Sequence, residues 1–147
     1  MGSTRLPGKV LKLVDDSHPS ILYTINQLQH CKLIDKIVIA TSIDSADDKI
    51  ATFAKNNSID VFRGDEVDVL SRYYHCAQQH SFSTILRVTA DCPLIDPLIV
   101  DTGIKIYKEN NYDYVTNTFP RTFPDGNETE IFSFSALETA YKNAVLP

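Results

Sequence analysis

The run Lys36-Ile37-Val38-Ile39-Ala40 is a short series of mostly β-branched residues, followed directly by Thr41 and Ser42. Such runs are typical of strands that are buried on both faces of a parallel sheet, and we expect Thr41 and Ser42 to end this strand. Residues 19–33 before it and 44–57 after it have the apolar spacing and capping residues of helices. The stretch therefore predicts a strand between two helices.

The same alternation continues along the chain. It predicts further strands over 59–62, 84–88, 112–117 and 129–134, and further helices over 68–80, 97–108 and from 135 onward. This order indicates an α/β fold of three layers, with a doubly wound, mostly parallel sheet in a single domain over 1–147. Ligands of such sheets collect at the carboxyl ends of the strands, so the turns near residues 41, 63, 89 and 117 should line one crevice.

The overall charge excludes several classes of partner. The 147 residues carry 14 Lys and Arg against 19 Asp and Glu, a formal net charge of −5. The cations are dispersed, so we expect no nucleic-acid partner. No apolar run is long enough for a membrane helix, and the three cysteines lack metal-ligand spacing. We therefore expect a cytoplasmic protein with free thiols, no membrane partner and no signal peptide.

The opening segment Gly2-Ser3-Thr4-Arg5-Leu6-Pro7-Gly8-Lys9 has the composition of a phosphate-binding loop. Glycines let backbone N–H groups approach an anion, hydroxyls add donors, and Arg5 and Lys9 supply charge. The spacing matches neither a Walker A loop nor the dinucleotide fingerprint. A solvated, flexible terminus that merely contains Gly and Ser is the alternative interpretation.

Asp91 follows a predicted strand at the expected crevice, where a carboxylate could hold a Mg²⁺ ion that bridges nucleotide phosphates. The alternative is that Asp91 only caps the turn before Pro93. Its neighbour Cys92 has no adjacent histidine, which favours a buried, inert thiol over a nucleophile.

Two arginines flank a polar loop. Arg63 and Arg72 enclose Asp65, Glu66 and Asp68, so the charges either form an exposed ion-pair network or leave Arg63 to donate to a base or a phosphate. A second loop, residues 117–126, is long for a strand connection. It is interpreted as a substrate-binding element or as a flexible excursion.

Five motifs occur in one order along the chain: the opening segment, Arg63-Gly64, residues 89–96, Tyr112-Asp113-Tyr114-Val115 and Phe123-Pro124-Asp125-Gly126. The chain resembles the cytidylyltransferase-like family of the spore coat polysaccharide biosynthesis F type, which is related to the acylneuraminate and 3-deoxy-manno-octulosonate cytidylyltransferases. The resemblance implies a nucleotide-diphospho-sugar transferase fold. It also implies a Mg²⁺-assisted reaction that joins CTP to a sugar or sugar acid, releases pyrophosphate and serves polysaccharide biosynthesis.

The resemblance also implies roles for individual residues. Arg5, Lys9 and Asp91 would be catalytic, with Asp91 holding Mg²⁺ and Arg63 reading the cytosine edge. The nucleotide-binding set would be Gly2, Ser3, Thr4, Arg5, Lys9, Arg63, Ser71, Arg72 and Thr89. The sugar side would be Asn117, Arg121 and Asp125.

The chain departs from the family pattern in three respects. Relatives have Gly-Asp-Glu-Pro where this chain has Ala90-Asp91-Cys92-Pro93. Relatives also have a first, central strand before the Gly-Ser-Thr-Arg loop, and a longer C-terminal part that supplies a second acidic metal ligand. We therefore expect a domain truncated at both ends, whose open strand edges favour a homodimer. A nucleotide-sugar-binding or glycosyltransferase-type module, or an inactive fragment, stays as an alternative function.

Overall fold

The computed structural model describes residues 6–145. These residues form two compact units, one of residues 6–35 and 86–131 and the other of residues 36–85 and 132–145. The unit boundaries fall inside two strands, β3 (Thr84–Arg87) and β5 (Glu130–Ser133). Within residues 6–145 no helix has the length and apolar character needed to cross a membrane.

The unit of residues 36–85 and 132–145 contains the parallel strand pair. Strand β1 (Val38–Ser42) pairs with β2 (Asp60–Gly64), in a register that places Thr41 opposite Arg63. A 3₁₀ turn, η2 (Ser45–Asp47), and helix α2 (Asp48–Asn56) connect the two strands. This β-α-β order and its parallel pairing are as the sequence predicted.

The expected end of the first strand was wrong. Thr41 and Ser42 belong to β1, and both are buried. A buried hydroxyl is costly without a hydrogen-bond partner, and the carboxylate of Asp47 accepts from both hydroxyls at 2.7 Å. Because Asp47 supplies this acceptor, two polar residues can extend a buried strand.

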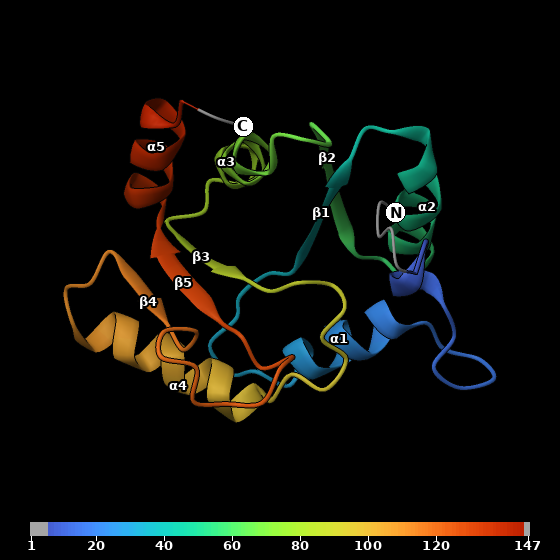
Figure 1. Cartoon of the computed structure of the whole chain (residues 1–147), viewed down its shortest axis with the longest axis horizontal. Helices are drawn as coiled ribbons and strands as arrows, with labels where there is room; N and C mark the ends of the chain where they lie inside the picture. The colour runs from blue at the N-terminus through green and yellow to red at the C-terminus, as the bar shows by residue number, and fades with distance from the viewer. Residues whose placement is uncertain (1–5, 146–147) are drawn as a thin grey trace. The chain divides into compact units, whose positions relative to one another are not determined.

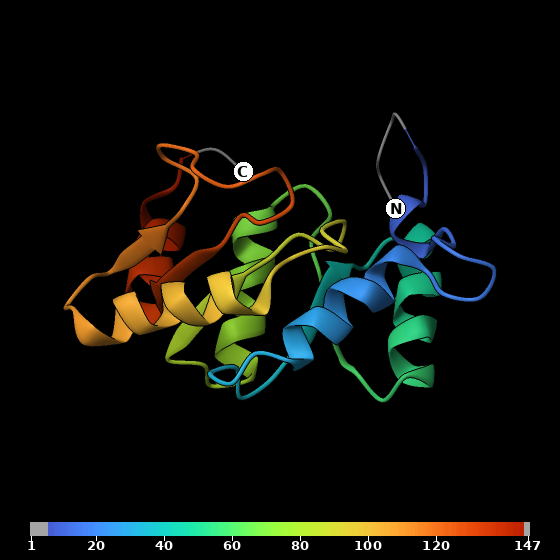
Figure 2. The same ribbon diagram turned by 90° about the horizontal axis from the view of Figure 1, so that it is seen from below.

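Helices α3 (Val69–Gln79) and α5 (Phe134–Asn143) lie side by side in the same unit (Figures 1 and 2). The ring of Tyr74 stacks on Tyr141 at a centroid distance of 4.2 Å and on Phe134 at 5.6 Å. Offset aromatic stacking adds about 0.5–1.5 kcal/mol per pair to the burial of the rings. These contacts hold the two helices together over a core of Tyr74, Ala77, Ile85, Phe132 and Leu137.

The other unit holds η1 (Lys9–Leu11), α1 (Ser20–Gln29), α4 (Pro97–Glu109) and β4 (Tyr114–Thr116). Figure 2 shows η1 next to the start of α1, and α4 packs along β4. Helix α4 comes so close to β5 at Gly103 that a Cβ there would lie 2.8 Å from Cδ1 of the fully buried Ile131. A larger residue at position 103 would therefore require the side chain of Ile131 to shift.

The described strands form two hydrogen-bonded groups. Strands β1 and β2 form one pair, and the other three strands have the order β3-β5-β4. The α/β class and the parallel pairing predicted from the sequence are confirmed. The sequence predicted one sheet, whereas hydrogen bonds in residues 6–145 join the strands in these two groups.

Asp101 on α4 fixes the chain that follows α1. Its side chain is buried and accepts hydrogen bonds from the backbone N–H groups of Lys32 and Leu33 at 3.0–3.1 Å. These N–H groups lie beyond the end of α1 and outside every helix and strand, so the side chain of Asp101 supplies the acceptor that their backbone lacks.

We expect Asp101→Ala to lower the free energy of unfolding by about 1–3 kcal/mol, because two partly buried N–H groups lose their acceptor. Urea unfolding followed by circular dichroism measures the change. Glu109→Ala truncates an exposed carboxylate on the same helix and should change stability by less than about 0.5 kcal/mol. Equal effects of the two substitutions would contradict the assigned role of Asp101.

Candidate functional site

Lys9 and Asp91 meet although 82 residues separate them in the sequence. Lys9 begins η1, Asp91 lies in the loop after β3, and the ammonium group of Lys9 forms an ion pair with the carboxylate of Asp91. The hydrogen bond from Lys9 holds the pKa of Asp91 below its ordinary value, so this carboxylate is ionised at neutral pH. The structure thus brings together two residues that the sequence placed at one site.

Asp91 also lines a cavity of about 540 Å³. The cavity lies within the unit of residues 6–35 and 86–131, after the ends of β3 and β4. Four of the predicted site residues belong to its lining: Thr89, Asp91, Arg121 and Asp125. The complete lining is Arg87, Thr89, Asp91, Cys92, Pro93, Leu94, Thr118, Arg121, Asp125, Gly126, Glu128 and Glu130.

Cys92 faces this cavity as a protonated thiol. It is buried, and its sulfur lies 3.0 Å from the hydroxyl oxygen of Thr89. Burial raises the pKa of Cys92, and burial likewise raises those of Cys31 and Cys76 to about 11. A thiol with a raised pKa is a poor nucleophile, which agrees with the inert role inferred from the sequence.

The loop of residues 117–126 folds back on itself through charged side chains. Arg121 forms ion pairs with Asp125 and, at 3.3 Å, with Glu128. Asn117 has a different place, because its amide donates to the carbonyl of Asn127 at 2.8 Å and accepts from the N–H of Thr129 at 2.9 Å. Asn117 therefore ties the two ends of the loop together and is not part of the cavity lining.

Sequence reasoning missed a second charged group in the cavity. Arg87 at the end of β3 forms an ion pair with Glu130 at the start of β5. The hydroxyl of Tyr114 donates to the other oxygen of Glu130 at 2.7 Å. Arg87 and Glu130 are charged residues within predicted strands that are otherwise apolar. This departure from the apolar pattern was the signal that could have identified them as site residues.

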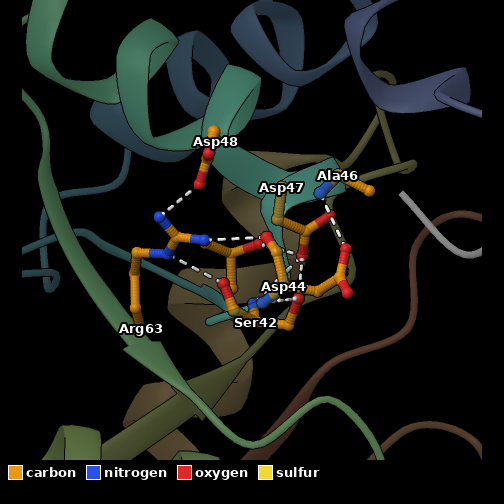
Figure 3. Close-up of polar contacts among 7 residues, drawn as sticks. Ser42, Asp44, Ala46, Asp47, Asp48 and Arg63 are labelled. Carbon is orange, nitrogen blue, oxygen red and sulfur yellow. Dashed lines mark hydrogen bonds and ion pairs between the residues drawn. The ribbon is translucent and has the colours of Figure 1, made fainter.

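Arg63 lies in the unit of residues 36–85 and 132–145, and Figure 3 shows how its guanidinium is held. Its Nε donates to the carbonyl of Ser42 at 2.9 Å, and its Nη2 donates to the carbonyl of Asp44 at 2.8 Å. Its Nη1 forms an ion pair with Asp48 at 2.6 Å. Three of its five N–H donors thus hold the turn after β1, and the other two have no hydrogen-bond acceptor among residues 6–145.

Asp47 holds the same turn from inside. Only 6% of Asp47 is exposed, and its carboxylate accepts from the backbone N–H of Ser42 at 3.0 Å in addition to the two hydroxyls of β1. Asp47 also directly precedes α2, where a carboxylate suits the positive end of the helix dipole. Its position five or six residues after two strand-end hydroxyls was the signal that could have revealed its second role.

Ser71 and Arg72 lie on α3, in the same unit as Arg63. The N–H of Ser71 donates to the capping carboxylate of Asp68 at 2.8 Å. Nη1 of Arg72 donates to the carbonyl of Asp65 at 2.6 Å and to that of Glu66 at 3.3 Å. Arg72 therefore holds the loop through backbone carbonyls, whereas an ion-pair network with the carboxylates of this loop was one of the two interpretations that the sequence left open.

The predicted nucleotide-binding residues accordingly fall into two groups. Lys9, Thr89 and Asp91 lie in one unit, and Arg63, Ser71 and Arg72 lie in the other. The remaining members of the set, Gly2, Ser3, Thr4 and Arg5, fall outside the residues that the structure describes. Their roles stay predictions.

The donor set at Asp91 can be compared with the needs of Mg²⁺. Between residues 6 and 145, no group of three or more His, Cys, Asp or Glu side chains could hold a metal ion. Mg²⁺ is usually held by one or two protein carboxylates together with substrate phosphates and water, rather than by an all-protein cage. A single ionised carboxylate at a cavity fits this pattern, so Asp91 is a suitable ligand when phosphate oxygens complete the shell.

Comparisons with known proteins point to one family. A family model described as cytidylyltransferase matches residues 1–146. The spore coat polysaccharide biosynthesis protein SpsF of Bacillus subtilis is 35% identical over 117 residues, which are 78% of this chain and 49% of that protein. The chain spans about half the length of the curated relatives it matches.

Two solved structures have the same fold. The structure of a cytidylyltransferase from Leptospira borgpetersenii matches with a TM-score of 0.92 and 37% identity, covering 100% of this chain and 62% of that one. CMP:2-keto-3-deoxy-manno-octonic acid synthetase, solved with CTP, matches with a TM-score of 0.72 and 13% identity, covering 97% and 74%. The chain has the fold of these proteins, and it belongs to the cytidylyltransferase family.

Proposed function

We propose that this chain is part of a CTP-dependent nucleotidyltransferase that joins CMP to a sugar or sugar acid and releases pyrophosphate for surface polysaccharide biosynthesis. The observation that carries the proposal is the ion pair of Lys9 and Asp91 at the cavity. The pair supplies a cation for phosphate oxygens and an ionised carboxylate for Mg²⁺ at one place. Membership of the cytidylyltransferase family supports CTP as the nucleotide.

In this reaction a sugar hydroxyl oxygen forms a bond to the α-phosphorus of CTP, the bond to pyrophosphate breaks, and the hydroxyl proton is released. The protein contributes by positioning the reactants and neutralising charge on the phosphate oxygens. Lys9 would bind the triphosphate, together with Arg5 and the backbone of Gly2, Ser3 and Thr4. Asp91 would hold Mg²⁺, which would supply positive charge to offset the negative charge that develops on the leaving group.

Arg63, Ser71 and Arg72 would bind the cytidine part of the nucleotide. For Arg63 the two N–H donors that do not hold the turn could reach the cytosine edge. Arg121 and Asp125 would face the sugar from the cavity lining, with Asn117 shaping their loop.

We expect isothermal titration of the full chain to show a preference for CTP over UDP-glucose, and tighter CTP binding with Mg²⁺ than without it. The physical reason is that Asp91 and the triphosphate share the metal. In Asp91→Asn the gain from Mg²⁺ should be lost, because the amide is a weak ligand for a hard cation.

Preference for UDP-glucose in this titration would support a nucleotide-sugar-binding module instead. If neither nucleotide binds, the fragment is inactive by itself. An unchanged response of Asp91→Asn to Mg²⁺ would leave Asp91 as a turn residue without a metal role.

We expect Lys9→Ala to weaken CTP binding by about tenfold or more, since a charge-assisted hydrogen bond contributes about 1.5–3 kcal/mol. Lys12→Ala removes an equal charge from an exposed residue just after η1, and it should leave the affinity nearly unchanged. Fluorescence titration with a labelled CTP analogue measures both. A similar loss in the two variants would indicate general attraction by positive charge rather than a specific contact.

Arg63→Ala tests base recognition. If Arg63 donates to the cytosine edge, the variant should lose most of its preference for CTP over ATP while its affinity for inorganic triphosphate stays within about twofold of the original. Competition titrations with CTP, ATP and triphosphate give these ratios. An equal loss for all three ligands, accompanied by a lower melting temperature, would show that Arg63 acts only by holding the turn after β1.

A further inference from the structure

The guanidinium group of Arg63 is held by two backbone carbonyls of the turn after β1. Its Nε donates to the carbonyl of Ser42 at 2.9 Å, and its Nη2 donates to that of Asp44 at 2.8 Å (Figure 3). The orientation of the guanidinium therefore depends on the position of these two carbonyls. Whatever fixes residues 42–44 also fixes Arg63.

Asp47 holds the first of the two carbonyl-bearing residues. Oδ2 of its carboxylate accepts from the backbone N–H of Ser42 at 3.0 Å and from the hydroxyl of Ser42 at 2.7 Å. That hydroxyl in turn accepts from the N–H of Asp44 at 3.3 Å. Because Ser42 and Asp47 are both buried, these hydrogen bonds to a charged group are shielded from water.

Asp47 holds the second carbonyl-bearing residue as well. Its backbone N–H donates to the carbonyl of Asp44 at 3.0 Å, and this oxygen is the one that accepts from Nη2 of Arg63. The next residue in the chain, Asp48, forms the ion pair with Nη1 of Arg63 at 2.6 Å. Each of the three contacts of the guanidinium is therefore made by a residue that Asp47 contacts or directly precedes.

The two ends of this network differ in exposure. Asp47 is buried, whereas 29% of the Arg63 side chain is exposed. Ordering a long side chain when a ligand binds weakens the affinity by about threefold to tenfold, and an arginine that is already held avoids this loss. A buried carboxylate can thus strengthen binding at the surface by holding the arginine in place.

We propose that Asp47 is a positioning residue for base recognition: it fixes the turn of residues 42–44, whose carbonyls hold Arg63 in the orientation that reads the cytosine edge. The inference rests on the proposed function, in which Arg63 donates to that edge. It deepens that function by assigning part of the base selectivity to a buried carboxylate that acts through the turn.

The first test follows Arg63 without a nucleotide. The Nε–H signal of Arg63 in ¹⁵N-resolved NMR spectra of the full chain is identified by its absence in Arg63→Lys. In Asp47→Asn the charge and one acceptor oxygen of the carboxylate are lost. We expect the Arg63 Nε–H to exchange with water at least about threefold faster in this variant, because the turn opens more often.

The second test measures base selectivity by competition titrations with CTP, ATP and inorganic triphosphate. We expect Asp47→Asn to lower the preference for CTP over ATP by about threefold to tenfold, while the affinity for triphosphate stays within about twofold. In an Arg63→Ala background the same substitution should cause no further loss of preference, because Asp47 acts through Arg63. A purely structural role would lower the melting temperature without this dependence on Arg63.

Ser42→Ala and Thr41→Val form a matched pair of variants. Each removes one buried hydroxyl that donates to Asp47 at 2.7 Å, but the carbonyl that accepts from the Arg63 side chain belongs to Ser42. We expect Ser42→Ala to lower the preference for CTP and Thr41→Val to leave it within about twofold, at similar losses of stability. If circular dichroism melts show that Asp47→Asn does not fold, this pair decides the question.

The outcomes separate this inference from the proposed function. If the original chain has no preference for CTP, the proposed function is contradicted, and the exchange of the Arg63 Nε–H still tests whether Asp47 positions Arg63. Three results would each overturn the inference: unchanged exchange in Asp47→Asn, a further loss of preference in the Arg63→Ala background, or equal effects of the matched pair on the preference.

Discussion

The ion pair between Lys9 and Asp91 is the interaction on which the candidate site depends. It joins the start of the described chain to the loop after β3, and so places a cation and an ionised carboxylate at the same cavity. The hydrogen bond from Lys9 stabilises the charged form of Asp91, as the lowered pKa of that carboxylate indicates. In the proposed function, a nucleotide that engages Lys9 would free Asp91 to accept a metal, and the pair would exchange one internal contact for two contacts with a ligand.

The arginines of this protein show why the presence of a cation does not by itself define an anion site. Arg63 and Arg72 donate largely to backbone carbonyls and so shape the turns that carry them. Arg121 and Arg87 are neutralised by carboxylates of the cavity lining. The planar guanidinium group of arginine can bind a ligand or hold a loop. Only its hydrogen-bond and ion-pair partners in the structure show which of the two it does.

Much of the fold could be predicted from the sequence because the apolar periods are clear. The expected helices correspond to α1 to α5 and the expected strands to β1 to β5, with shifts of a few residues at their ends. Strand β1 ends two residues later than predicted, because Asp47 accepts from the hydroxyls of Thr41 and Ser42. No hydrophobic period describes the turn that places Asp47 there. The motif residues Asp91, Arg121 and Asp125 were predicted as site residues, and the structure places all three in one cavity lining.

The sequence by itself determined the α/β class, the β-α-β order and the candidates for phosphate and metal binding, because these follow from local spacing and residue chemistry. Tertiary structure alone decided which charges meet. Lys9 forms an ion pair with Asp91, which lies 82 positions later in the sequence. Arg87 forms an ion pair with Glu130, 43 positions later. Arg63 pairs with Asp48 rather than with the acidic residues that follow it in the chain. Such pairings depend on the distance between the two charges in the folded chain. Residues that pair over a long sequence separation form no periodic pattern, so the sequence alone does not identify them.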